Sequence, residues 1–111
     1  MAIEHWSNEI VIVHLPQEPE MSDELTAITE FISARENYDV VVDFSSVDNV
    51  TSSELLKLLK LHQVTARGGR RLVLCNIDPA TQDIFSVTGL GDVFELTCDK
   101  STALATLEMI G

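Results

Sequence analysis

Short apolar runs alternate with amphipathic segments along this chain, and this alternation restricts the fold more than any other feature. The runs at 10–15 (IVIVHL), 39–44 (DVVVDF) and 71–77 (RLVLCNI) are apolar almost throughout. Such runs are typical of strands in a parallel sheet that is covered on both faces. The segments between them carry apolar residues at helical spacing. Strands alternating with helices predict an α/β fold with right-handed crossovers.

The expected order of elements is β-β-α-β-α-β-α-β-α. At the N-terminus, runs at 2–7 and 10–15 flank a polar pair and predict a hairpin. Pro16 and Pro19 predict an irregular segment over residues 16–21, and Ser22 is expected to begin the first helix. The later elements are expected as a helix at 52–67, a helix capped by Asp78 that starts at Pro79 and ends near Gly89, a strand at 92–97 and a helix at 101–110.

The length of 111 residues is that of one domain, and the sequence contains no repeat, linker or low-complexity segment. We therefore expect residues 1–111 to form a single α/β domain. Its sheet is expected to be mixed but mostly parallel, with an antiparallel hairpin strand at the N-terminus and about four helices.

The charge of the chain argues against two classes of partner. Its formal net charge is -11, from 18 acidic and 7 basic residues. Such a surface repels nucleic-acid phosphates and anionic lipid headgroups, so we expect no direct binding of nucleic acid or membrane. The first residues do not resemble a signal peptide, and Cys75 and Cys98 belong to no metal-binding cluster. A reduced cytoplasmic setting is expected.

Motifs of catalysis are absent from the sequence. It contains no phosphate-binding P-loop, no GxGxxG after the first strand and no GxSxG elbow. His5, His14 and His62 share no metal-ligand spacing, and each is expected to be a structural histidine with a hydrogen-bond partner. We therefore expect a protein that is not an enzyme, with no catalytic residue, no cofactor and no metal.

Three hydroxyl residues, Thr51, Ser52 and Ser53, lie where the loop after the 39–44 strand becomes a helix. In open α/β sheets, the carboxyl ends of the strands form the edge where ligands and partners bind. Thr51 and Glu54 have the spacing of a capping box, which assigns them a structural role. Ser52 and Ser53 fall at the first two helical positions and cap nothing. A phosphate there would be tolerated by the positive end of the helix dipole.

The helix at 52–67 is expected to have two distinct faces. The inward face comprises Leu55, Leu58, Leu59 and His62. The outward stripe comprises Ser53, Lys57, Lys60, Val64 and Arg67, with Leu56 and Leu61 partly exposed along its borders. This stripe is the only concentration of basic residues on an acidic chain. It is either a docking surface for a partner or an ordinary solvated face.

These residues resemble the STAS domains, a family named for sulfate transporters and anti-sigma factor antagonists. The segment VVVDFSSVDNVTSSEL (40–55) is similar to the apolar strand, Asp, short loop and hydroxyl-bearing helix start of that family. Asp43 falls on the Asp that closes the strand, and Ser52 falls on the regulatory phosphoacceptor serine. The similarity covers residues 40–107 without a gap, through LVLCNIDP, TGLGDVFEL and Ala103-Leu104.

The resemblance implies a partner switch that regulates transcription indirectly. The unphosphorylated domain would bind an anti-sigma factor serine kinase, which holds the ATP, and a phosphatase would reverse phosphorylation. Ser52 would be the phosphoacceptor, with Thr51 and Ser53 as secondary candidates. The partner-binding residues would be Ser53, Glu54, Leu56, Lys57, Lys60 and Leu61.

This chain departs from the pattern of the family at three places. Thr51 and Glu54 stand where the family usually has Asp and Gly, so a carboxylate lies near the acceptor. Leu56 stands where a small residue is frequent, and PQEPEM (16–21) replaces the usual Gly-x-Leu-Asp. Two alternative functions therefore stay open: a STAS scaffold module that is never phosphorylated, and a sensor of a small anion or nucleotide at the start of the 52–67 helix.

Overall fold

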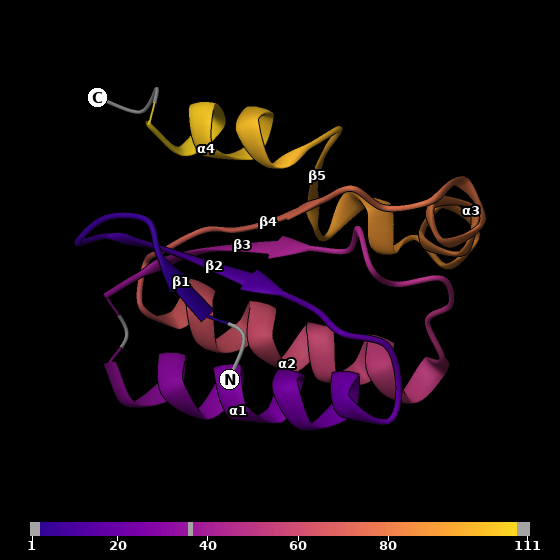
Figure 1. Ribbon diagram of the computed structural model, residues 1–111, viewed down its shortest axis with the longest axis horizontal. Helices are drawn as coiled ribbons and strands as arrows, with labels where there is room; N and C mark the ends of the chain where they lie inside the picture. The colour runs from indigo at the N-terminus through magenta and orange to yellow at the C-terminus, as the bar shows by residue number, and fades with distance from the viewer. Residues whose placement is uncertain (1–2, 36, 109–111) are drawn as a thin grey trace.

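A computed structural model of the protein describes residues 3–35 and 37–108. Within those residues, the fold is a five-stranded sheet with four α-helices and one short 3-10 helix (Figure 1). The elements are β1 (Ile3–His5), β2 (Ile10–His14), α1 (Glu20–Arg35), β3 (Asp39–Asp43), α2 (Ser52–Arg67), β4 (Leu72–Cys75), α3 (Pro79–Thr88), η1 (Leu90–Asp92), β5 (Glu95–Thr97) and α4 (Lys100–Glu108).

The strands lie in the sheet in the same order as in the sequence, β1-β2-β3-β4-β5. β1 pairs with β2 antiparallel, and every later pair is parallel. The predicted mixed sheet with an N-terminal antiparallel hairpin and about four helices is confirmed. Because the sheet grows in one direction, right-handed crossovers place α1 and α2 on the same face.

Each face of the sheet has its own apolar core. α1 and α2 cover one face and α4 covers the other, as Figure 1 shows below and above the strands. Alternate residues of each central strand therefore point into different cores: Val40 and Val42 of β3 face α1 and α2, whereas Val41 faces α4. This explains why the central strands are apolar on both faces, with polar residues only at their ends.

The predicted start of the first helix at Ser22 is wrong, because α1 begins at Glu20. The acceptor at this helix start is the carboxylate of Glu18, whose Oε1 accepts from the Ser22 amide at 2.8 Å. The Ser22 hydroxyl itself donates to Glu18. The two prolines predicted an irregular segment that includes Met21. In the structure, Met21 is buried in the core against the sheet.

The last two elements also differ from the sequence expectation. β5 spans only Glu95–Thr97, because residues 90–92 form the 3-10 helix η1. α4 begins at Lys100, one residue before the expected start. Its predicted end at Ile110 lies outside the described residues. Among the helices in the described ranges, none combines the length and hydropathy needed to cross a membrane.

The predicted faces of α2 are partly wrong. Leu61 and Val64 were expected along the outward stripe, but their side chains are 0% and 2% exposed. The reason is that α1 packs alongside α2, so α2 is buried both against the sheet and against a neighbouring helix (Figure 1). The buried arc of α2 is consequently wider than one apolar stripe and is rotated toward α1. Leu56, in contrast, is 68% exposed.

Candidate functional site

The start of α2 is held by the predicted capping box, which is confirmed. Thr51 has an extended backbone conformation, and its Oγ1 accepts from the Glu54 amide at 3.3 Å. In return, the Thr51 amide donates to Glu54 Oε1 at 2.7 Å. These two bonds satisfy backbone groups that every helix start leaves without an intrahelical partner. The position of Ser52 as the first residue of the helix is thereby fixed.

Ser52 and Ser53 are both exposed, and neither side chain forms a hydrogen bond with another described residue. The hydroxyl of Thr51 differs, because it is already an acceptor in the cap. Acidic groups are stabilised at this end of a helix by the helix dipole. Ser52 and Ser53 are therefore the hydroxyls at the α2 start that a modifying enzyme can reach without breaking the cap.

The exposed face of α2 runs from this helix start along the solvent side. Ser52, Leu56 and Lys60 follow one another at intervals of four residues, which places them on one face. The face is completed by Ser53, Gln63 and Arg67, all exposed. Leu56 lies in its middle. We call these six residues the α2 docking face.

Two residues predicted to contact a partner do not belong to this face. Leu61 is fully buried against the core, and Glu54 is only 1% exposed because its carboxylate lies in the capping box. Neither side chain can be reached from solvent in the folded domain. The prediction that they lie on the partner surface is therefore wrong in this structure.

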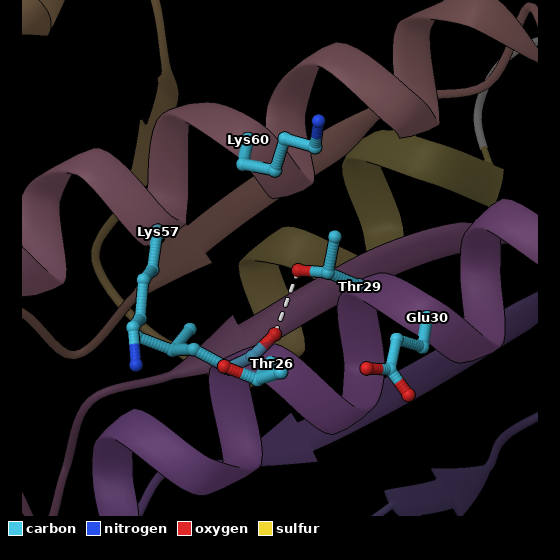
Figure 2. A pocket seen from close by; sticks show the side chains of 6 residues that line it. Thr26, Thr29, Glu30, Lys57 and Lys60 are labelled. Atoms are coloured by element: carbon cyan, nitrogen blue, oxygen red, sulfur yellow. Dashed lines mark hydrogen bonds between the residues drawn. The ribbon is translucent and has the colours of Figure 1, made fainter.

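A shallow groove of about 250 Å³ runs between α1 and α2 beside the docking face. Figure 2 shows Lys57 and Lys60 on the α2 side, with Thr26, Thr29 and Glu30 on the α1 side. Lys57 is only half-exposed, because its Nζ donates to the backbone oxygen of Ser22 on α1 at 3.2 Å. Lys57 thus links the two helices, whereas Lys60 is exposed to solvent.

Asp43 anchors the chain segment that leads from the sheet to α2. It is the last residue of β3, as the resemblance predicted, and is 6% exposed. Its carboxylate accepts from the Asn76 side chain at 2.9 Å and from the Ser45 amide at 3.0 Å. Burial acts to raise the pKa of Asp43, but these hydrogen bonds outweigh it, so the pKa lies below its usual value. A charged Asp43 is therefore part of the folded state.

His14 extends this network to the edge of the sheet. Its Nδ1 is 3.1 Å from Asp43 Oδ2, and its Nε2 is 3.1 Å from Glu4 Oε1 on β1. The expectation of a hydrogen-bonded structural histidine is thus confirmed for His14. His62 packs edge-on against Phe94 instead.

Sites for other chemistry are not evident in the part of the chain that the structure describes. No cluster of three or more His, Cys, Asp or Glu side chains there is arranged to hold a metal ion. Cys75 is buried as predicted, and burial raises the pKa of its thiol to about 12, so the reactive thiolate is scarce. Cys98 is exposed.

The fold and the capped, hydroxyl-bearing start of α2 define the class of this protein. The chain belongs to the STAS domain family, whose family model matches residues 8–105. No sequence among curated proteins matches the chain.

Solved structures of similar fold include proteins described as anti-sigma factor antagonists. An anti-sigma factor antagonist (STAS) domain protein from Planctomyces limnophilus is 17% identical, with a TM-score of 0.83 and 96% of each chain covered. The unphosphorylated form of the antagonist SpoIIAA is 16% identical, with a TM-score of 0.76 and 97% of each chain covered. The phosphorylated form of SpoIIAA, a Bacillus cell fate determinant, is 17% identical, with a TM-score of 0.71; the match covers 94% of this chain and 96% of the SpoIIAA chain.

Proposed function

We propose that this domain is an anti-sigma factor antagonist that binds a cytosolic anti-sigma kinase through the α2 docking face. In this proposal the kinase supplies the ATP and phosphorylates Ser52, the complex dissociates, and a phosphatase restores the unphosphorylated domain. The domain itself is not an enzyme. The observation that carries the proposal is the exposed Ser52 at the capped start of α2, one helical turn from the exposed Leu56.

The position of Glu54 removes one objection to phosphorylation. A carboxylate exposed beside the acceptor would repel the incoming phosphate. The Glu54 side chain is instead buried under the cap, where its Oε1 accepts from the Thr51 amide. The Ser52 hydroxyl lies at the positive end of the α2 dipole, which favours a negative charge there.

A phosphate on Ser52 acts mainly on the complex rather than on the domain. It adds about two negative charges. At a desolvated contact, an unpaired charge costs several kcal/mol, so affinity falls about a hundredfold or more. The helix dipole stabilises the same phosphate by at most about 1 kcal/mol. Loss of the complex therefore outweighs the local gain.

The test is a titration of Ser52→Asp and Ser52→Ala against an anti-sigma factor serine kinase from the same organism, with nucleotide present. Ser52→Asp is expected to weaken binding about a hundredfold, and Ser52→Ala to bind normally but resist ATP-dependent release. Ser101→Asp is the matched control, because it places the same charge at the exposed start of α4 on the opposite face of the sheet.

Two results would contradict the proposal. If Ser52→Asp binds the kinase as tightly as the wild type, the charge does not act at the contact. If mass spectrometry after incubation with kinase and ATP finds no phosphate on Ser52, Ser53 or Thr51, the domain is not a phosphorylated switch. Tight binding without phosphorylation would support the alternative of a scaffold module.

A further inference from the structure

The groove between α1 and α2 is apolar inside, although most of the residues that line it are polar. Thr26 and Thr29 each donate their hydroxyl to a carbonyl four residues earlier on α1, at 3.0 Å and 2.6 Å; Figure 2 shows the Thr29 bond. The ammonium of Lys57 donates to the carbonyl of Ser22. These donors are used within the domain, so methyl and methylene groups are left to line the groove above the buried Leu25.

Lys60 and Glu30 form the charged rim of this groove. Lys60 lies on the α2 wall and Glu30 on the α1 wall, and both are exposed. Figure 2 shows their charged groups directed away from each other, and neither forms a salt bridge with another described residue. One wall therefore presents a cation and the other an anion, and both charges are available to a partner.

The charge of each wall continues along its helix. Asp23 lies seven residues before Glu30 on α1, and Arg67 lies seven residues after Lys60 on α2. Seven residues are close to two helical turns, so each pair lies along one face of its helix. All four side chains are exposed. We call Asp23 and Glu30 the acidic row, and Lys60 and Arg67 the basic row; the apolar groove lies between them.

The size and shape of the groove favour a protein helix as its occupant. Pockets for small molecules usually have about 300–1,000 Å³ and enclose most of the ligand, whereas this groove has about 250 Å³ and is shallow. It lies between two helices that pack side by side (Figure 1), so a third helix can lay a row of apolar side chains into it. A second copy of the chain presents a groove rather than a ridge, and the net charge of -11 on each copy opposes their association.

We propose that the α1–α2 groove binds an amphipathic helix of a partner protein. Apolar side chains of that helix enter the groove. Acidic side chains on one flank face the basic row of α2, and basic side chains on the other flank face the acidic row of α1. The site adjoins the α2 docking face, with which it shares Lys60 and Arg67, but it requires neither Ser52 nor a phosphate and so goes beyond the proposed function.

The probe is a synthetic helical peptide, held by lactam bridges because short isolated helices are marginal in water. It carries leucines at every third or fourth position, glutamates on one flank and lysines on the other. Binding to the 15N-labelled domain is followed by NMR, without kinase or nucleotide. Amide shifts are expected to change along α1 and α2 at the groove. A peptide with serines in place of the leucines is expected to bind about tenfold more weakly or less, because the apolar contact supplies most of the affinity.

Variants of the domain test the groove and its rim separately, after urea unfolding has confirmed that each is folded. Thr29→Trp places a large ring in the groove and is expected to weaken peptide binding about tenfold or more. Thr106→Trp is the matched control, because Thr106 is also half-exposed and donates to the carbonyl four residues earlier, but on α4 across the sheet. Lys60→Glu is expected to weaken binding about threefold at low salt and less at high salt. Lys100→Glu makes the same charge reversal at the start of α4 and is expected to have no effect.

The inference is overturned if the leucine peptide binds no better than the serine peptide, if its shift changes lie outside α1 and α2, or if Thr29→Trp and Thr106→Trp bind it equally well. A wild-type dimer that Thr29→Trp dissociates in sedimentation would also overturn it, because the occupant would then be a second copy. Ser52→Asp is expected to bind the peptide like the wild type, since Ser52 lies about two turns before Lys60. Failure of the peptide test therefore leaves the Ser52 proposal intact, and failure of the Ser52 proposal leaves this result intact.

Discussion

Thr51→Ala and Ser52→Ala are adjacent truncations with very different expected effects on stability. Thr51 Oγ1 accepts from the Glu54 amide at 3.3 Å, a long bond, whereas the reciprocal 2.7 Å bond from the Thr51 amide survives truncation of the side chain. Loss of a cap typically costs about 1 kcal/mol. For a long bond with its reciprocal bond intact, we expect about 0.5–1 kcal/mol, or about 2–4 °C in Tm for a domain of this size. Ser52→Ala is expected to cost nothing measurable, because the exposed Ser52 hydroxyl caps nothing.

Urea unfolding followed by circular dichroism measures both variants, with Thr51→Ser as the control that retains the cap. Thr51→Ser is expected to unfold close to the wild type, because a serine hydroxyl accepts the same bond. Ser52→Asp is expected to stabilise the isolated domain slightly through the helix dipole. If Ser52→Ala destabilises the domain more than Thr51→Ala, the helix begins one residue later than described and Ser52 is the cap rather than the exposed acceptor.

Two further predictions concern the core and the acid limit of stability. In chemical unfolding, Leu61→Ala is expected to lower the free energy of unfolding by about 2–5 kcal/mol, because Leu61 is 0% exposed. Leu56→Ala is expected to lower it by less than about 0.5 kcal/mol, because Leu56 is 68% exposed. Equal costs would contradict the described rotation of α2. The lowered pKa of Asp43 predicts that its contribution to stability is present above pH 3.8 and is lost as the pH falls through the lowered pKa. Unfolding from pH 3 to pH 6 is expected to show a weaker acid dependence in Asp43→Asn, and an unchanged dependence would refute this role.

The order of strands and helices was predictable from sequence because it depends on local patterns. The apolar runs at 10–15 and 39–44 identify central strands, because a strand in a sheet that helices cover on both faces is apolar on both sides. The capping box was likewise predictable, because Thr51 and Glu54 lie three residues apart. Each of these features is determined by residues that are close together in the chain.

The rotation of α2 was not predictable in the same way. It depends on α1, a separate segment that packs beside α2. Leu61 looks like a border residue on an isolated helix and becomes buried only when α1 is present. Glu18 carried a local signal that was not used, because it lies four residues before Ser22, whose amide donates to its carboxylate at the start of α1.

The strand order also determines how the domain assembles during synthesis. Because each strand pairs with the one made just before it, none has to be inserted between two strands that are already paired. This sequential order keeps the segment between paired strands as short as a parallel crossover allows. The second face of the sheet, however, is covered by α4, which follows all five strands in the described residues. A nascent chain in which α4 has not yet been made exposes Ile12, Val41 and Val73 to solvent, so the ribosome-bound domain presents an apolar surface until α4 is synthesised.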